Sequence, residues 1–122
     1  MAGLSSHSEE WTDAEFCYLT TTGRRSGKPH TIEIWFALHE GRVFMLAGGR
    51  DKSDWIRNLR IEPRVSVRVG EQTLHGNARV LEEGTEDDQL ARRLLVEKYE
   101  PIERDSLAEW GRSSLPVVIE FS

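Results

Sequence analysis

The residues best suited to chemistry lie in one short stretch, residues 20–30, with the sequence Thr-Thr-Thr-Gly-Arg-Arg-Ser-Gly-Lys-Pro-His. It contains two glycines, three fixed positive charges and a serine, and no acidic residue. Glycine lets a backbone approach a ligand closely, while arginine and lysine donate charge-assisted hydrogen bonds to anions. The composition predicts an anion-binding loop, and we interpret it as holding the phosphate of a flavin-like cofactor.

Two other roles are compatible with a basic, glycine-containing loop. A phosphate-binding P-loop has four residues between its glycines and Ser or Thr after the lysine. Here three residues separate Gly23 from Gly27, Pro29 follows Lys28, and a strand pattern comes next. The sequence therefore excludes a nucleotide hydrolase of that class. An exposed hairpin loop whose basic residues serve only solubility remains open from the loop alone.

Histidine and cysteine give weaker signals. The four histidines, at positions 7, 30, 39 and 75, have no ligand-like spacing and no cysteine partners, so we predict no metal site. Cys17 lies within a strand pattern with no base nearby. This context favours a buried apolar residue over a nucleophile.

Aromatic and polar residues after the loop could contact a cofactor. Trp35 shares one face of its strand with Glu33, where an aromatic side chain could stack on a ring, although core packing is the alternative. A helix start is surrounded by Lys52, Trp55 and Asn58. Free amides at such a position favour anions, although Trp55 taken alone would be a core residue.

Length and composition predict one globular domain over residues 1–122. The hydrophobic fraction is 38% and the charged fraction 30%, which excludes a disordered chain. No apolar run approaches the length of a membrane span, and residues 1–10 lack a signal-peptide pattern. The single cysteine fits a reducing compartment, so we expect a cytoplasmic protein.

The charge distribution disfavours a nucleic-acid binder. Residues 82–105 hold nine acidic and four basic residues, and this excess of five equals the formal net charge of −5. A protein that binds nucleic acid along its surface is usually basic. The acidic segment is most simply a solvated helix face, with an interaction surface as the alternative.

Alternating apolar residues and turn signals predict six strands, over residues 16–22, 31–39, 42–47, 65–69, 73–81 and 116–121. The alternation is clearest over residues 31–39. One side carries Ile32, Ile34, Phe36 and Leu38, and the other carries Thr31, Glu33, Trp35, Ala37 and His39. A tight turn at Glu40-Gly41 follows.

Helices are predicted between these strands. A short turn covers residues 11–15, capped by Thr12 or Asp13, after flexible residues 1–10. A second helix follows Ser53 and stops at Pro63. A third follows a Thr85 cap and ends before Pro101, with an apolar stripe of Leu90, Leu94, Leu95 and Tyr99. A last short turn covers residues 107–110.

Consecutive strands joined by tight turns favour an antiparallel sheet. With six short strands, closure into a barrel removes the exposed sheet edges best. We therefore predict a mainly β fold, a six-stranded antiparallel closed or split β-barrel with peripheral helices.

Taken together, these features resemble the deazaflavin (F420)-dependent nitroreductase and F420H2-dependent quinone reductase family, within the split β-barrel, FMN-binding-like superfamily. The likeness spans residues 16–121. Its strongest motif is residues 20–29, which match the family pattern Thr-Thr-x-Gly-Arg-Lys/Arg-Ser/Thr-Gly-x-Pro. Two further motifs follow in order: Trp55–Leu59 with Glu62-Pro63 and residues 65–67, then Trp110–Arg112 leading into residues 115–118.

The resemblance implies an enzyme that binds reduced coenzyme F420 and passes a hydride from the deazaflavin C5 to a quinone, enone or nitro compound. By motif position, the cofactor's phosphate and acidic tail would be held by Arg24, Arg25, Ser26, Gly27 and Lys28. The pocket would be lined by His30, Glu33 and Trp35 and closed by Lys52 and Trp55. Barrels of this kind usually pair through their sheets, so a homodimer with the cofactor near the interface is expected.

The substrate side departs from the family pattern. Tyr99 is the counterpart of one family aromatic residue over the substrate, which makes it the candidate catalytic residue. Ile102 and Asp105 stand at the other aromatic positions, and Gly48 stands where a serine is linked to substrate. We expect quinone or enone reduction to exceed nitroimidazole reduction. The proton donor could be Tyr99, His30 or solvent.

Three other functions remain open at the level of sequence. The nearest is an FMN-dependent oxidoreductase on the same barrel. Another is a flavin- or deazaflavin-binding protein without turnover. A third is a nucleic-acid module that uses Arg24, Arg25 and Lys28, which the acidic balance disfavours.

Overall fold

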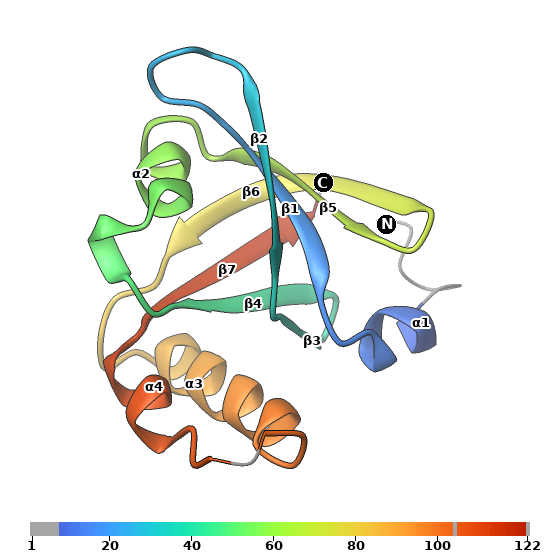
Figure 1. The fold of residues 1–122 in the computed structure, drawn as a ribbon, viewed down its shortest axis with the longest axis vertical. Helices are drawn as coiled ribbons and strands as arrows, with labels where there is room; N and C mark the ends of the chain where they lie inside the picture. The colour runs from blue at the N-terminus through green and yellow to red at the C-terminus, as the bar shows by residue number, and fades with distance from the viewer. Residues whose placement is uncertain (1–7, 104, 122) are drawn as a thin grey trace.

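Seven strands form one antiparallel sheet with helices around it, in a computed structural model that describes residues 8–103 and 105–121 (Figure 1). The helices are α1 (Ser8–Asp13), α2 (Asp54–Ile61), α3 (Glu86–Tyr99) and α4 (Ala108–Ser113), with a 3₁₀ turn η1 (Arg50–Lys52). The strands are β1 (Cys17–Thr22), β2 (Pro29–Ile34), β3 (Ala37–His39), β4 (Arg42–Ala47), β5 (Arg64–Val69), β6 (Gln72–Val80) and β7 (Leu115–Phe121). None of the described helices has the length and apolar character needed to cross a membrane.

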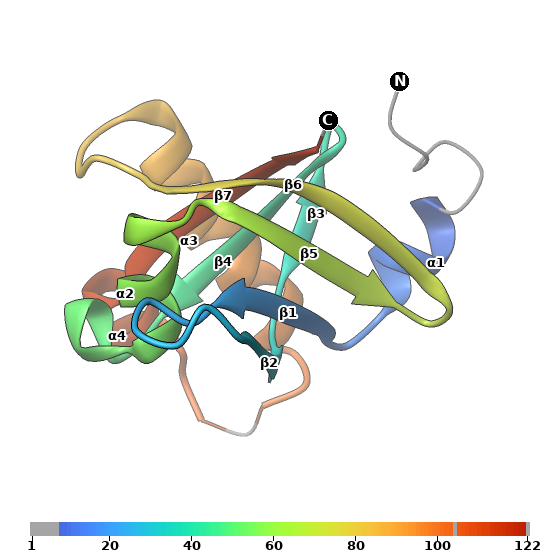
Figure 2. The same cartoon turned by 90° about the horizontal axis from the view of Figure 1, so that it is seen from above.

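The strand order makes the sheet curl. The strands run β2-β1-β5-β6-β7-β4-β3, and every neighbouring pair is antiparallel. β2 and β3 stand at opposite ends of this order, yet only Trp35 and Phe36 separate them in the chain. Because so short a connection spans at most about 11 Å, the two ends of the sheet must approach each other. The result is the curled, half-barrel sheet visible from above in Figure 2.

The prediction of six strands is wrong by one, because residues 31–39 form two strands. β2 pairs with β1, where Ile34 lies opposite Cys17. β3 instead pairs with β4, where Ala37 lies opposite Phe44. The chain therefore changes its partner strand within two residues, which a continuous strand cannot do.

The bend between β2 and β3 is held by the end of α3. The hydroxyl of Tyr99 accepts a hydrogen bond from the Phe36 backbone N–H at 3.0 Å, and its own proton can go to the carbonyl of Phe36 or of Glu15. The Lys98 ammonium donates to the Phe36 carbonyl at 2.9 Å. Side chains keep alternating through the bend, since Phe36 joins the inner cluster and Trp35 the outer one. This continuity explains why the sequence reads as one strand.

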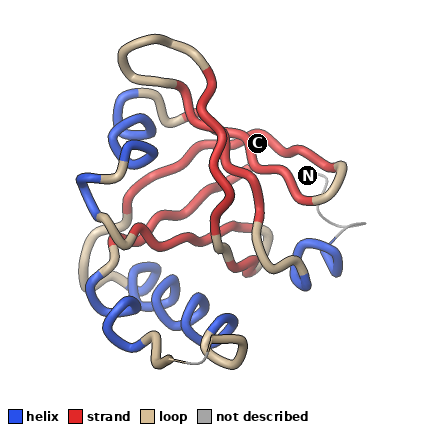
Figure 3. Tube along the Cα trace, viewed as in Figure 1, coloured by secondary structure: helices blue, strands red, loops and turns tan. Residues whose placement is uncertain are grey.

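Two hydrophobic clusters fill the two faces of the sheet. Inside the curl, strand residues pack with Trp11 of α1 and with Ile56 and Leu59 of α2. The second cluster lies between the outer face of β4 and β7 and the helices α3 and α4, which cover that side in Figure 3. The predicted apolar stripe of α3 is confirmed, because this second cluster includes Leu90, Leu94, Leu95 and Tyr99.

The predicted caps of α2 and α3 are largely confirmed. The Thr85 hydroxyl accepts a hydrogen bond from the Asp88 N–H at 3.2 Å, which satisfies one free amide of the first turn of α3. Ser53 precedes α2 with extended backbone, although its side chain makes no capping hydrogen bond. The Glu40-Gly41 turn is also confirmed, with positive φ angles of 51° and 79° at its two residues.

The first helix differs from the prediction of a turn over residues 11–15. α1 begins at Ser8, so Thr12 and Asp13 lie at its end and cap nothing at its start. Trp11, within this helix, is fully buried and donates from its indole N–H to Gln72 Oε1 at 2.9 Å, which anchors the helix to β6. Of the predicted flexible residues, 1–7 lie outside the described part of the chain.

Candidate functional site

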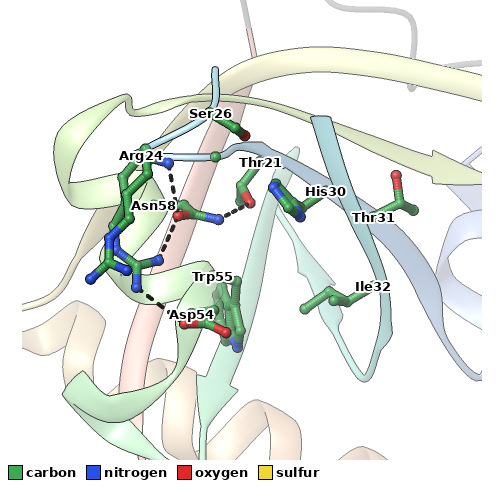
Figure 4. Close-up of a pocket in the computed structure, with 11 residues that line it drawn as sticks. Thr21, Arg24, Ser26, His30, Thr31, Ile32, Asp54, Trp55 and Asn58 are labelled. Carbon is green, nitrogen blue, oxygen red and sulfur yellow. Dashed lines mark hydrogen bonds and ion pairs between the residues drawn. The ribbon is translucent and has the colours of Figure 1, made fainter. Parts of the chain in front are cut away.

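A pocket of about 510 Å³ opens between the β1–β2 loop, β2 and the start of α2 (Figure 4). β1 and β2 contribute one group of lining residues, and α2 contributes another. Its lining consists of Thr21, Gly23, Arg24, Arg25, Ser26, His30, Thr31, Ile32, Asp54, Trp55 and Asn58. The loop, the helix start and the strand that the sequence singled out therefore converge on one cavity.

The β1–β2 loop is closed by its own backbone. The Gly23 N–H donates to the Lys28 carbonyl at 2.7 Å, and the Gly27 N–H donates to the Gly23 carbonyl at 2.8 Å. Gly27 has a φ of +73°, a conformation that side-chain-bearing residues rarely adopt. At Gly23, a Cβ atom would lie 2.6 Å from His30 Nε2 and 2.7 Å from Ser26 Oγ. The conformation of the loop therefore favours glycine at position 27, and a side chain at position 23 would require His30 and Ser26 to move.

Asn58, on α2, holds the β1–β2 loop through hydrogen bonds. Its Oδ1 accepts hydrogen bonds from the backbone N–H of Arg24 at 3.1 Å and from Arg24 Nη1 at 2.9 Å. Its Nδ2 donates to Thr21 Oγ1 at 3.1 Å. Asn58 is only 4% exposed, so these three bonds satisfy an amide that would otherwise be costly to bury. Figure 4 shows this chain of contacts from β1 through Asn58 to the Arg24 guanidinium.

The three cationic side chains of the loop differ in their burial and in their hydrogen-bond and ion-pair partners. Arg24 is mostly buried, and its Nη2 lies 3.3 Å from Asp54 Oδ1. Arg25 and Lys28 are exposed, and their side chains have no hydrogen bond or ion pair within the described residues. Two positive charges are therefore available to a ligand beside a third that is already partly neutralised.

The structure brings some of the predicted site residues together and leaves others apart. His30, on β2, and Trp55, on α2, line the pocket with the loop residues Arg24, Arg25 and Ser26. The residues that do not line it are Gly27, Lys28, Glu33, Trp35, Lys52 and Tyr99. Gly27 and Lys28 belong to the same loop, and Lys52 lies exposed in η1. Glu33 accepts a hydrogen bond from the Tyr18 hydroxyl at 3.3 Å.

Trp35 and Tyr99 lie together in the outer core cluster. Their rings stack with centroids 4.2 Å apart and planes 4° from parallel, and Trp110 meets Trp35 edge-on at 5.5 Å. Tyr99 is 0% exposed, and its hydroxyl is engaged with backbone at the β2–β3 bend. This placement favours packing and positioning roles for the two side chains over direct contact with a ligand.

Burial controls the protonation of the groups around this bend. It raises the pKa of the Cys17 thiol to about 12, an effect that the nearby Lys98 partly offsets. It lowers the pKa of the Lys98 ammonium to about 8 and raises the pKa of Tyr99 above its usual range. Cys17 is fully buried, so its predicted role as an apolar core residue is confirmed.

Six pocket residues were not predicted as site residues from the sequence: Thr21, Gly23, Thr31, Ile32, Asp54 and Asn58. Thr21 is the last inward-facing residue of β1, and Asn58 was noted only for its place near a helix start. Asp54 brings an acid into a pocket whose loop contains none. The signal for Asn58 was its polar character within an otherwise apolar helix face, between Trp55, Ile56 and Leu59.

Comparison with known proteins identifies the family and agrees with the fold. The sequence model of the F420H(2)-dependent quinone reductase family matches residues 3–122. A solved chain described as a domain-swapped dimer is 31% identical, with a TM-score of 0.71, over 88% of this chain and 81% of that chain. An F420-H2 dependent reductase, FDR-A, is 30% identical, with a TM-score of 0.69, over 87% of this chain and 94% of that chain. A conserved hypothetical protein from Mycobacterium tuberculosis is 22% identical, with a TM-score of 0.76, over 96% of this chain and 79% of that chain, and shows the shared fold.

Proposed function

This chain belongs to the F420H(2)-dependent quinone reductase family and is an F420H2-dependent reductase, and we propose that it reduces small electrophiles of the quinone, enone or nitro class. When bound, reduced F420 supplies the hydride for such a reduction. The work of the protein is then to bind the cofactor, orient its ring and limit the access of water to the reacting atoms. FMN, the alternative cofactor, receives no support from the family match.

The observation that carries the proposal is the β1–β2 loop beside a pocket of about 510 Å³, which Arg24 and Arg25 line. Lys28, on the same loop, is exposed outside this lining, and neither its side chain nor that of Arg25 has a hydrogen bond or ion pair within the described residues. Such donors fit a tail that carries a phosphate and several carboxylates, because each can form charge-assisted hydrogen bonds. The Ser26 hydroxyl, which lines the pocket, adds an uncharged donor beside them.

The other wall of the pocket suits an aromatic ring. Ile32 and Trp55 supply apolar surface, and His30 lies between them and the loop. We infer that the cofactor ring lies toward Ile32 and Trp55, while its charged tail lies toward the loop. Glu33, Trp35 and Lys52 would then act from outside this pocket, Trp35 by supporting the bend at the end of β2.

Proton delivery to the reduced acceptor is assigned to solvent or to His30. His30 is exposed and lines the pocket. Tyr99, the catalytic candidate from the resemblance, is fully buried, and burial raises its pKa, so its proton is held more tightly than in an exposed tyrosine.

The acceptor is proposed to be a quinone or enone in preference to a nitroimidazole. The positions expected to hold substrate-side aromatic residues are Ile102 and Asp105, both exposed, and Gly48 offers no side chain. We therefore expect few directed polar contacts to a nitro group and a site that accepts a planar, activated carbonyl compound.

The test is anaerobic oxidation of F420H2 by the purified protein with a naphthoquinone, a cyclohexenone and a nitroimidazole in parallel. Recovery of the oxidised deazaflavin absorbance reports turnover, and FMNH2 in its place tests the alternative cofactor. We expect turnover with F420H2, highest kcat/KM for the quinone or enone, and none above background with FMNH2. Tight F420 binding without turnover of any acceptor would identify a carrier.

We also propose that the curled sheet is a split β-barrel and that two copies pair as a homodimer. The similar chain described as a domain-swapped dimer supports pairing. Light scattering of the purified protein should give twice the 14.0 kDa mass of one chain. A monomer mass at the concentrations used for catalysis would reject the dimer without affecting the cofactor assignment.

A further inference from the structure

One acidic residue lies inside the cationic pocket. Asp54, the first residue of α2, lines the cavity, and its Oδ1 is 3.3 Å from Arg24 Nη2. Its side chain is 83% exposed, whereas that of Arg24 is 21% exposed. The carboxylate therefore approaches the guanidinium from the open side, which is the side from which a ligand must come.

Arg24 does not need Asp54 to keep its position. Asn58, which is buried, accepts hydrogen bonds from both the Arg24 backbone N–H and its Nη1, at 3.1 and 2.9 Å. These two bonds fix the start of the side chain and one end of the guanidinium. Asp54 takes the remaining end, Nη2, which is the end that an incoming phosphate or carboxylate could use.

An exposed ion pair of this kind contributes little to stability. Such pairs typically contribute well under 1 kcal/mol, because water and salt screen them and two side chains lose freedom. An anionic ligand group bound to Arg24 would still lie well within about 8 Å of the Asp54 carboxylate, the screening length at physiological salt. The Asp54 carboxylate therefore weakens the binding of an anionic ligand group more than it stabilises the folded state.

We propose that Asp54 is a specificity-determining residue of the anion pocket, a resident counter-ion that competes with the ligand for Arg24 and limits how much negative charge the pocket accepts. This inference rests on the proposed cofactor site and adds to it a selection by tail charge. An anionic ligand group near Arg25 and Lys28 meets no competing carboxylate from Asp54. A second anionic group near α2 must displace Asp54 from Arg24 or share Arg24 with it.

The test compares Asp54→Asn with Asp51→Asn. Asp51 is 65% exposed, pairs with Arg60 at 2.9 Å and does not line the pocket. Both substitutions remove one negative charge from the same segment, so the second controls for the change in net charge. Affinities are measured by fluorescence titration with F420, FMN and a tail-less deazaflavin, each at low and at physiological salt. Urea unfolding of each variant confirms that it is folded.

We expect Asp54→Asn to bind F420 about two- to fivefold more tightly than the parent at low salt, the size expected for an exposed pair. The gain in affinity should be smaller for FMN and absent for the tail-less deazaflavin. It should also decrease with added salt. Asp51→Asn should match the parent for all three ligands. Equal or weaker F420 binding by Asp54→Asn, or an equal gain in Asp51→Asn, would overturn the proposal.

A second probe separates this proposal from the cofactor assignment. Inorganic pyrophosphate, followed through the amide resonances of Gly23 to Gly27, measures anion binding without any deazaflavin. If F420 does not bind the parent but pyrophosphate binds Asp54→Asn more tightly than Asp51→Asn, the cofactor assignment fails and the counter-ion role stands. If pyrophosphate shifts these resonances in none of the three proteins, the counter-ion role fails as well.

Discussion

Asn58 is the residue that connects the buried core to the pocket. Replacing it by alanine would leave the Arg24 donors and the Thr21 hydroxyl without their partner. A buried polar group left unsatisfied typically costs about 1–3 kcal/mol. We expect Asn58→Ala to lower the free energy of unfolding by that amount, measured by urea denaturation, and to weaken F420 binding.

A double-mutant cycle tests how Asn58 acts on the ligand. If Asn58 acts by holding Arg24, then Asn58→Ala should add little to the affinity loss already caused by Arg24→Ala. F420 titration of the two single variants and the double variant measures this coupling. Fully additive losses would show that Asn58 contacts the ligand independently of Arg24.

Lys98 gives the protein a predicted pH dependence. Burial lowers its pKa to about 8, below the value of about 10.4 in an unfolded chain. Between these values the unfolded state binds more protons than the folded state, so stability rises with pH through this range. Cys17, whose pKa is raised to about 12, opposes the rise increasingly as the pH approaches and passes about 8.5, the pKa of the unfolded thiol.

From pH 7 to pH 8.5, the gain in stability from Lys98 exceeds the loss from ionisation of the unfolded Cys17 thiol. We expect the urea midpoint of the parent to increase across this window and that of Lys98→Met to decrease slightly. Methionine keeps an unbranched apolar stem and removes the ammonium that lies 4.1 Å from the Phe36 ring centroid, so it is a suitable control for packing. The same dependence of the urea midpoint on pH in both proteins would show that a group other than Lys98 titrates.

At the residue scale, the sequence was most informative where a local motif carried the function. The spacing of the glycines and cations in the β1–β2 loop predicted an anion-binding segment, and Gly23, Arg24 and Arg25 of this loop line a pocket, whereas Gly27 and Lys28 do not. Asp54 and Asn58 reach the same pocket from more than 25 positions away along the chain. Local spacing holds no information on such a meeting, which depends on how α2 packs against β1.

At the scale of elements, the decisive feature is the bend that divides β2 from β3. The alternation of residues 31–39 correctly predicted that Phe36 and Trp35 lie on opposite sides, and the structure places Phe36 in the inner cluster and Trp35 in the outer one. It could not predict the break, because the bend preserves the alternation. The hydrogen bonds that hold the bend come from Tyr99 and Lys98, more than 60 residues later.

Tyr99→Phe distinguishes a role in the bend from a role in catalysis. The variant keeps the ring that stacks on Trp35 and loses the hydroxyl that accepts from the Phe36 N–H. We expect the free energy of unfolding to fall by about 1–3 kcal/mol, with kcat for quinone reduction retained below the unfolding temperature. A large loss of kcat with unchanged stability would instead support Tyr99 as the proton donor.

At the scale of the whole molecule, the charge distribution makes the loop a local exception. The chain carries a net charge of −5, and its acidic excess lies in residues 82–105, which include α3. In Figure 1, α3 lies on the opposite side of the sheet from the β1–β2 loop. An anionic ligand is therefore drawn to one end of the molecule, and its affinity should fall with added salt.

The central claim is that Arg25 and its neighbours in the loop hold the anionic tail of F420. The most direct measurement is a fluorescence titration of the parent and of Arg25→Ala with F420 and with a tail-less deazaflavin at low salt. Arg93→Ala is the matched control, because Arg93 is an exposed cation of α3, paired with Glu97, that loses the same charge away from the pocket.

Hydrogen bonds to charged groups typically contribute about 1.5–3 kcal/mol, so Arg25→Ala should bind F420 roughly ten- to a hundredfold more weakly. Its affinity for the tail-less deazaflavin, and the affinity of Arg93→Ala for both ligands, should stay at the parent values. Arg25→Ala that binds F420 as tightly as the parent would contradict the claim and reduce the loop to a solvent-exposed hairpin.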